Sequence, residues 1–316
     1  MENSTLAVLQ KACAWRESGA LPWLCTVVTT LGSAPRPVGS LMACLESGEQ
    51  VGSVSGGCVE EDLLERIRSG ELAVSGPQIV EYGLDPEQNE RLGLPCGGRI
   101  AVLVESFRDD GPPWARRVID ALRERRNVVR RFDVERNHSV IETADGVTET
   151  RFDGSVLTHF FGARQRMILI GAGQLAVAIS EMAQALEFEV FVTDPRGQML
   201  EHWEGPEVTL RGGMPDDVIR EIGVDAQTAI ITLSHDPRID DMALMYALAE
   251  EAWYVGALGS LKTTEKRLER LRQLGLSEQD LSRLHAPVGL PIGSKTPVEI
   301  AVAVMAELIQ ARQGIG

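Results

Sequence analysis

The sequence predicts an α/β protein of two domains, in which an N-terminal α+β domain precedes a domain built on a parallel sheet. From residue 166 onward, apolar strands alternate with helical segments, which is typical of repeated βαβ units. Before that point, short strands follow one another with few helices between them, as in α+β proteins. A chain of 316 residues is long enough to form two hydrophobic cores.

Composition and charge exclude several classes of partner. The formal net charge is -15, and a surface this acidic repels nucleic acid and anionic membranes. No apolar stretch reaches the roughly 20 residues that a bilayer span needs. The first residues also lack the basic start and long apolar run of a signal peptide. We therefore expect a cytoplasmic protein without a membrane span.

The five cysteines point to a reducing compartment, because an odd number in a large chain does not suit a disulfide framework. They form no CxxC pair, which argues against a structural zinc site. Three of them lie in helix or strand patterns and are predicted to be core residues. In chain order the cysteines are Cys13, Cys25, Cys44, Cys58 and Cys96.

Local patterns predict the elements of the N-terminal domain in order. Apolar spacing indicates a helix over 5–17, the run after the SGGC loop a helix from Cys58, and Pro113 a helix over 113–125. A domain boundary near 162–165 separates a domain of residues 1–162 from one of residues 163–316. The predicted strands are 24–30, 40–44, 51–54, 79–82, 100–105, 128–134, 139–143, 147–151 and 158–161.

The second domain begins with a continuous apolar strand, 167–170, of the kind that is buried on both faces of a parallel sheet. The last helix is signalled by Thr296 as N-cap, Pro297 at the first helical position and Glu299 three residues after the cap. Further strands are predicted at 189–193, 208–210, 228–233 and 253–258, and further helices at 175–186, 216–222, 240–250 and 263–274.

A GxGxxA run follows the first of these strands and opens the helix after it. Gly171 permits the tight turn, Gly173 lets the backbone approach a diphosphate, and Ala176 lets helix and strand pack closely. Free N–H groups at the helix start would face an anion, so Gln174 joins the glycines as a predicted contact. In this context the run predicts a Rossmann-type domain. The alternative is a turn that only packs, in a fold without a ligand.

An acid and a base follow at the end of the next strand. Asp194 stands 23 residues after Gly171, where it could accept hydrogen bonds from a ribose diol or simply close the strand. Arg196 could pair with Asp194 or reach a phosphate. The sequence leaves both interpretations open for both residues.

Glycine-rich loops of the N-terminal domain form a second group of candidate residues. Cys58 lies at a helix start, where the helix dipole favours thiolate, and Cys96 lies in a glycine loop. Either cysteine could serve sulfur chemistry or bind a metal, or could be a small packing residue. Arg36, held between two prolines, could clamp a phosphate or carboxylate, or be a solvated arginine. The glycines whose amides could face an anion are Gly56, Gly57, Gly97 and Gly98. The acids Glu60, Glu61 and Asp62 are interpreted as favourable charges in a first helical turn.

Two more candidates follow strands of the second domain. His235 comes after the strand 228–233, at the carboxyl end of the sheet where ligands bind in this architecture. It could contact a cofactor or relay a proton, or it could order its loop. Ser260 and Lys262 open another helix at the same edge and could add an anion contact.

Taken together, these segments resemble the XdhC/CoxI family of maturation factors for molybdenum hydroxylases, and the forms SGGCVE and LPCGG look closer to the CoxI-like branch. The resemblance extends over both domains in order. The matching runs are GSAPRPVGS (32–40), GSVSGGCVEED (52–62), GLPCGG (93–98), ILIGAGQLA (168–176), FVTDPR (191–196), TLSHDPRIDD (232–241), YVGALGS (254–260) and LHAPVGLPIGSKTPVEIAVAVMAELI (284–309).

The resemblance implies a protein that binds the molybdenum cofactor, either as molybdopterin or as its cytosine dinucleotide. Such a protein assists replacement of an oxo ligand by sulfur through a cysteine desulfurase, and delivers the cofactor to an apo molybdenum hydroxylase. Carried over to this sequence, Cys58 and Cys96 become the candidate molybdenum or sulfur contacts. Gly171, Gly173 and Asp194 become the candidate nucleotide or phosphate contacts.

Two other functions compete with this one. The Rossmann features alone would favour an NAD(P)-dependent oxidoreductase, but the sequence shows no Tyr/Lys pair at helical spacing, and the N-terminal glycine loops would go unexplained. A regulatory protein with a degenerate nucleotide pocket is the third hypothesis. We expect an accessory factor rather than a turnover enzyme, and a homodimer from the general prevalence of dimers.

Overall fold

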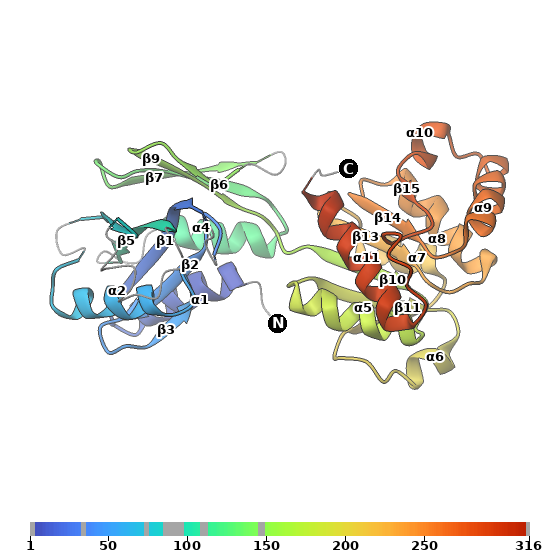
Figure 1. Cartoon of the computed structure of the whole chain (residues 1–316), viewed down its shortest axis with the longest axis horizontal. Coiled ribbons are helices and arrows are strands. Elements are labelled where there is room, and N and C mark those ends of the chain that lie inside the picture. The colour runs from blue at the N-terminus through green and yellow to red at the C-terminus, as the bar shows by residue number, and fades with distance from the viewer. Residues whose placement is uncertain are drawn as a thin grey trace. The chain divides into compact units, whose positions relative to one another are not determined.

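The computed structural model describes residues 4–32, 36–72, 76–84, 98–107, 113–144 and 149–313, with only the backbone of Cys58. These residues divide into two compact units, one ending at Ala163 and the other beginning at Arg164. The boundary expected from the sequence lies one residue earlier. Each unit has its own sheets and its own hydrophobic core (Figure 1).

Two antiparallel sheets form the framework of the N-terminal unit. Within the described residues, the first has five strands in the order β3-β2-β1-β5-β4, and the second has four in the order β7-β6-β9-β8. Their bounds are β1 (Pro22–Leu31), β2 (Leu41–Leu45), β3 (Gln50–Gly52), β4 (Gln78–Tyr82), β5 (Arg99–Ser106), β6 (Val128–Asp133), β7 (His138–Thr143), β8 (Arg151–Phe152) and β9 (Val156–Phe161).

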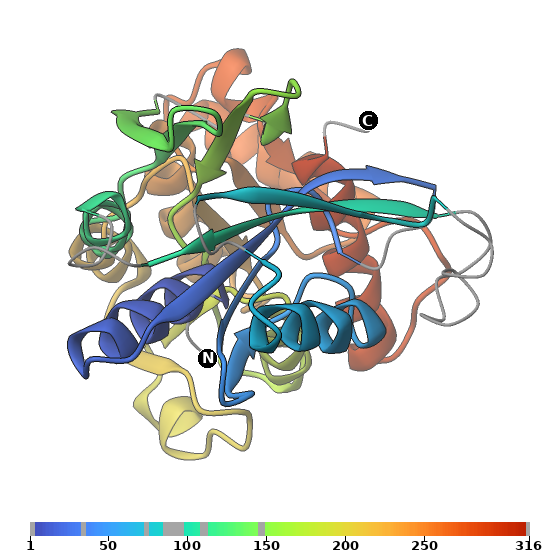
Figure 2. The same cartoon turned by 90° about the vertical axis from the view of Figure 1, so that its left-hand side faces the viewer.

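Helices cover both faces of the five-stranded sheet (Figure 2). Successive side chains of a strand point to opposite faces. Leu24 of β1 accordingly packs with α1 (Ser4–Glu17) and α4 (Pro113–Arg123), whereas Cys25 packs with α2 (Cys58–Arg68). This alternation explains why β1 is buried almost throughout.

A buried ion pair joins the two sheets of this unit. Arg130 of β6 is fully buried, and both of its terminal nitrogens donate to the carboxylate of Glu105 on β5, one of them at 2.9 Å. The guanidinium carbon also lies 3.7 Å from the centre of the Trp114 ring. The pair thus satisfies two charges that neither sheet could bury alone.

The C-terminal unit is built on a parallel sheet whose order, within the described residues, is β12-β11-β10-β13-β14-β15. Strand β10, the first of this unit along the chain, is apolar at every central position because helices cover both of its faces. The bounds are β10 (Arg166–Ile170), β11 (Glu189–Asp194), β12 (Thr209–Gly212), β13 (Thr228–Thr232), β14 (Tyr254–Ala257) and β15 (Leu284–His285).

Helices α5 (Gln174–Ala185) and α11 (Pro297–Arg312) lie side by side on one face of this sheet (Figure 1). The core of the other face includes residues of α7 (Pro215–Ile222), α8 (Pro237–Ala249), α9 (Leu261–Gln273) and α10 (Glu278–Leu281). A short helix, α6 (Gly197–Glu201), follows β11. The predicted fold class, an α/β chain with a C-terminal Rossmann-type domain, is confirmed.

Differences from the predicted elements are local. Helix α8 begins at Pro237 rather than at 240, because Asp236 caps it by accepting a hydrogen bond from the N–H of Arg238. The short elements α6, α10 and β15 were not predicted, since pieces of two to five residues carry no periodicity. Of the predicted strand 147–151, only Arg151 lies in β8, and residues 145–148 lie outside the described part of the chain.

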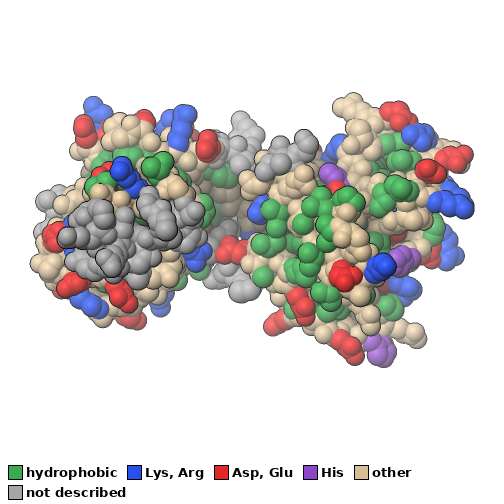
Figure 3. Space-filling view, viewed as in Figure 1, with side chains coloured by type: hydrophobic (Ala, Val, Ile, Leu, Met, Phe, Trp, Pro, Cys, Tyr) green, Lys and Arg blue, Asp and Glu red, His purple; other side chains and the backbone are tan. Residues whose placement is uncertain are grey.

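Helix α11 presents an apolar stripe to solvent, formed by Val298, Val302 and Ile309, and apolar side chains gather over that helix (Figure 3). None of the helices in the described ranges is both long enough and apolar enough to cross a bilayer. The homodimer expected from the sequence stays a prediction.

Candidate functional site

A cavity of about 710 Å³ opens at the carboxyl edge of the parallel sheet. It lies at the point where the chain leaves β10 in one direction and β13 in the other, which is where ligands bind in open α/β sheets. Six of the residues predicted from the sequence line it: Gly171, Gly173, Gln174, Arg196, His235 and Ser260. The fold therefore brings together candidates that are up to 89 residues apart in the chain.

The fold itself requires a glycine at position 171. Its φ is +109°, in the region that side chains rarely adopt, and a Cβ there would lie 2.9 Å from the backbone of Ser234. The turn after β10 and the loop after β13 thus approach too closely for any side chain between them. This position is fixed by packing, whether or not a ligand binds.

Gly173 is different, because the fold places no demand on it. Its φ of -92° and ψ of -178° suit any residue, and a Cβ built there would meet no atom within 4 Å. The residue is the N-cap of α5, where no side chain caps the free N–H groups and no acid lies in the first turn. A glycine in such a place lets a ligand approach the exposed amides closely.

Asp194 lies beneath this turn, fully buried, and does not line the cavity. Its carboxylate accepts hydrogen bonds from the N–H of Ala172 at 3.0 Å and from the backbone and guanidinium of Arg196. Burial raises the pKa of this carboxyl, but the hydrogen bonds from Arg196 and Ala172 outweigh that effect and hold the pKa below its ordinary value. In this arrangement the carboxylate has no surface left for a ribose diol.

Arg196 combines the two roles that the sequence left open. It pairs with Asp194, with its Nη2 atom 2.8 Å from Oδ2, yet half of its side chain is exposed and it lines the cavity. The guanidinium therefore brings a positive charge to the wall of the cavity beside the glycine turn.

His235 lies in the loop between β13 and α8 with a φ of +62°, a conformation that is uncommon for histidine. The loop is held by its neighbours, since the Ser234 hydroxyl donates to Asp240 at 2.7 Å and Asp236 caps α8. His235 is exposed and lines the cavity, and the contacts of Ser234 and Asp236 hold its loop in place.

The start of α9 forms another wall. Ser260 is its N-cap and accepts a hydrogen bond from the N–H of Thr263 at 3.2 Å. Arg267 also lines the cavity, although it is only 2 % exposed, and it donates to the carbonyl of Leu258 and to Asp240. Burial raises the pKa of that Asp240 carboxyl.

Sequence reasoning missed two cations of this cavity, Arg267 and Lys295. Lys295 precedes Thr296, the N-cap of α11, and the sequence did predict that helix start. No local sequence pattern, however, indicates that this helix start lies beside the glycine turn. Lys262, the predicted extra contact, is exposed and does not line the cavity.

The SGGC loop of the N-terminal unit is folded around a carboxylate of its own chain. Glu60, 4 % exposed, accepts hydrogen bonds from the N–H groups of Val54, Ser55, Gly56 and Gly57 at 2.8–3.0 Å. The hydroxyls of Ser53 and Ser55 donate to it as well. Burial raises the Glu60 pKa, but the hydrogen bonds from the loop outweigh this and lower it to about 2.

The amides of Gly56 and Gly57, which the sequence predicted to face an external anion, therefore already donate to Glu60. This gives Glu60 a larger role than the helix-end charge inferred for it from the sequence. Cys58 begins α2 directly after the loop. Its side chain, and the whole of Cys96 and Gly97, lie outside the described residues. Gly98 precedes β5, and its carbonyl oxygen lies close to Gly83.

Arg36 lines a separate cavity of about 350 Å³ in the N-terminal unit, together with His159. The imidazole of His159 is buried, and burial together with the charge of Arg130 lowers its pKa to about 3. The ring is therefore neutral at physiological pH, and this cavity is less cationic than that of the C-terminal unit.

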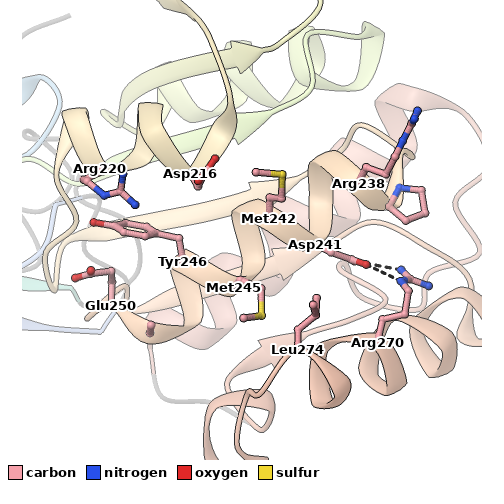
Figure 4. A pocket seen from close by; sticks show the side chains of 12 residues that line it. Asp216, Arg220, Arg238, Asp241, Met242, Met245, Tyr246, Glu250, Arg270 and Leu274 are labelled. Carbon is pink, nitrogen blue, oxygen red and sulfur yellow. Dashed lines mark hydrogen bonds and ion pairs between the residues drawn. The ribbon is translucent and has the colours of Figure 1, made fainter.

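A shallow groove of about 730 Å³ lies along the outer side of α8 (Figure 4). Met242, Met245 and Leu274 give it an apolar floor, and the ion pair of Asp241 with Arg270 closes one end. None of the predicted site residues lines this groove, and its apolar character does not suit an anionic ligand. In the part of the chain that the structure describes, no three His, Cys, Asp or Glu side chains are arranged to hold a metal ion.

Comparison with known proteins places these features in a family. Residues 167–308 match the model of the XdhC Rossmann domain, and residues 15–83 match that of the XdhC and CoxI family. The chain is 28 % identical to a Bacillus subtilis protein described as a probable subunit of xanthine dehydrogenase, over 92 % of this chain and 93 % of that protein. It is 29 % identical to the molybdenum cofactor insertion chaperone PaoD of Escherichia coli, over 93 % of this chain and 85 % of that protein.

Among solved structures, the fold is similar to that of a protein described as a xanthine dehydrogenase from Bacillus halodurans, with a TM-score of 0.78 and 25 % identity. The likeness covers 99 % of this chain and 97 % of the other. Both parts of the chain thus match in sequence and in fold. The chain belongs to the XdhC/CoxI family.

Proposed function

We propose that this protein is a maturation factor that binds the molybdenum cofactor and inserts it into a hydroxylase of the xanthine dehydrogenase or carbon monoxide dehydrogenase type. The observation that carries the proposal is Gly173, a glycine that the fold does not require, at the mouth of a cationic cavity. The similarity to an insertion chaperone over 93 % of the chain supplies the class of cargo.

The chemistry of the cavity fits such a cargo. The cofactor is a pterin dithiolene with a terminal phosphate, sometimes extended by a nucleotide, and its net charge is negative. Exposed amides at the start of α5, with Arg196 and Lys295 in the wall, favour an anion over a neutral ligand. We infer that Gly171, Gly173, Gln174, Arg196, His235 and Ser260 hold the phosphate or nucleotide end.

Cys58 and Cys96 are proposed as the contacts for molybdenum or for sulfur. Cys58 lies at a helix start, which favours thiolate, and soft thiolates suit molybdenum. Gly97 and Gly98 would support the Cys96 contact, and Arg36 a second anionic group. A cysteine desulfurase would supply the sulfur and an apo hydroxylase would receive the cofactor, while this chain holds and releases it.

The structure gives less support to an NAD(P)-dependent oxidoreductase. In a dinucleotide site the acid after the second strand accepts hydrogen bonds from the ribose diol. Here Asp194 is fully buried and its oxygens are taken by Ala172 and Arg196. A nicotinamide dinucleotide would lack its usual ribose contact.

Retention of the cofactor tests the proposal. The full chain is incubated anaerobically with molybdenum cofactor and, separately, with NAD and NADP, and then passed through gel filtration. We expect molybdenum and pterin to elute with the protein, and Gly173→Ala to reduce retention at least tenfold. Gly197→Ala is the matched control, because its Cβ is equally unobstructed but lies outside the cavity.

The cysteines are tested in the same assay. Cys58→Ala and Cys96→Ala should each weaken retention of molybdenum. Retention of NAD alone, with turnover of an alcohol or hydroxy acid, would overturn the proposed function.

A further inference from the structure

Two helices of the C-terminal unit differ from the others at their N-termini. Among the described helices of eight or more residues in this unit, α7, α8 and α11 carry an acid in the first turn. Helices α5 and α9 carry none. Both begin at the cavity, through Gln174 and Ser260. The two helix starts without their own counter-charge therefore face the same space.

These two starts are too far apart to share one phosphate. Helix α5 follows β10 and α9 follows β14, and β13 lies between those strands. Neighbouring strands are about 4.8 Å apart, so about 10 Å separates the two strand ends. The cavity of about 710 Å³ is also far larger than a single small anion, since one water occupies about 30 Å³.

Buried and exposed cations support a second anion position at α9. Arg267 lines the cavity at 2 % exposure, and its Nε atom has no hydrogen-bond partner, the oxygen of Asp241 being 3.8 Å away. Its guanidinium pairs with Asp240 at 3.1 Å and brings a buried positive charge to this wall of the cavity. Lys295 lines the same cavity, and among the described residues its ammonium group makes no ion pair.

We propose that the cavity binds one ligand through two anionic groups about 10 Å apart. The first lies at the Gly171–Gly173 turn beside Arg196, and the second at the start of α9 between Lys295 and Arg267. This inference rests on the site of the proposed function and deepens it, since it specifies a ligand charged at both ends.

A series of α,ω-alkane bisphosphonates, from the methylene to the octamethylene compound, measures this separation directly. All members have the same two charged groups and differ only in the distance between them. Titration calorimetry on the full chain should give a maximum of affinity at an intermediate length, about tenfold above the methylene compound, because each charge-assisted contact adds to the binding. Affinity that does not depend on length, or that rises steadily to the longest chain, would contradict the proposal.

Lys295→Gln and Lys262→Gln form a matched pair of variants. Lys262 is also at the start of α9 and exposed, but it does not line the cavity. We expect Lys295→Gln to abolish the maximum of affinity and Lys262→Gln to keep it. If Lys295→Gln still shows the maximum of bisphosphonate affinity, Lys295 does not contact the second anionic group and that part of the proposal is wrong. If the bisphosphonate maximum is found but the protein retains no molybdenum cofactor, the proposed function fails and the two-anion site stands.

Discussion

The carboxylate of Asp194 lies 3.0 Å from the backbone nitrogen of Ala172, and their hydrogen bond joins the end of β11 to the glycine turn that follows β10. The next residue of that turn, Gly173, opens onto the cavity. Asp194 therefore holds the turn from within the fold, and Arg196 completes its shell of donors. The sequence left open whether this acid contacts a ligand or closes the strand, and in the structure it holds the glycine turn in place.

Replacement of Asp194 by asparagine should lower the free energy of unfolding by about 2 kcal/mol, because the buried negative charge and one of the two acceptor oxygens are lost. Urea unfolding measures the change. The control is Asp217→Asn, which removes an exposed ion pair with Arg220 and should stay within about 0.5 kcal/mol. Equal effects of the two substitutions would show that Asp194 has no structural role.

The two glycines of the turn should respond in opposite ways to alanine. Gly171→Ala places a Cβ 2.9 Å from backbone atoms at a positive φ, and should cost about 2–4 kcal/mol of stability. Gly173→Ala meets no atom and should change stability by less than about 1 kcal/mol, while it weakens binding of phosphate. Denaturant unfolding and calorimetry with phosphate separate these effects. A large loss of stability in Gly173→Ala would mean that the fold does require this glycine.

Glu60 should make the N-terminal unit sensitive to acid. Because its pKa is lowered to about 2 in the folded protein, it stabilises the fold fully above its ordinary pKa, and this contribution is lost as the pH falls toward 2. Glu60→Gln should therefore cost about 3 kcal/mol at neutral pH. The difference from the unmodified protein should shrink progressively below about pH 4.5.

Unfolding curves at a series of pH values test the Glu60 prediction, with Glu61→Gln on the same helical turn as the control. Glu61 is exposed and should show no such dependence. Hydrogen exchange of the Gly56 and Gly57 amides should accelerate in Glu60→Gln alone. If the difference in unfolding free energy between Glu60→Gln and the unmodified protein does not vary with pH, the assignment of the low pKa to Glu60 is contradicted.

The buried pair of Arg130 and Glu105 should be more costly to break than to remove. Arg130→Met leaves an uncompensated carboxylate inside the unit and should cost about 3–5 kcal/mol. Glu105→Leu combined with Arg130→Met removes both charges and should recover much of that loss. A double-mutant cycle by urea unfolding measures the coupling. Additive losses would indicate that the two charges are stabilised independently.

The sequence predicted the architecture where periodicity and capping act locally. The strand 167–170 and the helix after it follow from an unbroken apolar run and two glycines, and Thr296 with Pro297 marks the start of α11. Six cavity residues could be named because parallel strands bring their carboxyl ends to one edge.

Other parts of the site depend on contacts between distant segments, which no local pattern contains. Lys295 reaches the cavity only because α11 packs beside α5, more than 100 residues earlier in the chain. The burial of Asp194 depends on the position of the Ala172 amide in the neighbouring turn. Glu60 was interpreted as a helix-end charge because its spacing fits that role, and its enclosure by Ser53–Gly57 requires the folded loop.

The unobstructed space around Gly173 has a consequence for how members of the family diverge. Gly171 is constrained by contacts within its own chain, so related proteins should keep it whether or not they bind a ligand. A side chain at Gly173 would meet no atom of the chain, so under the proposed function only the ligand constrains this position, and a lineage that loses the ligand can replace it without penalty to folding. In a related protein, a glycine at the position of Gly171 would therefore indicate the shared fold, and a glycine at the position of Gly173 would indicate a cavity that still binds its ligand.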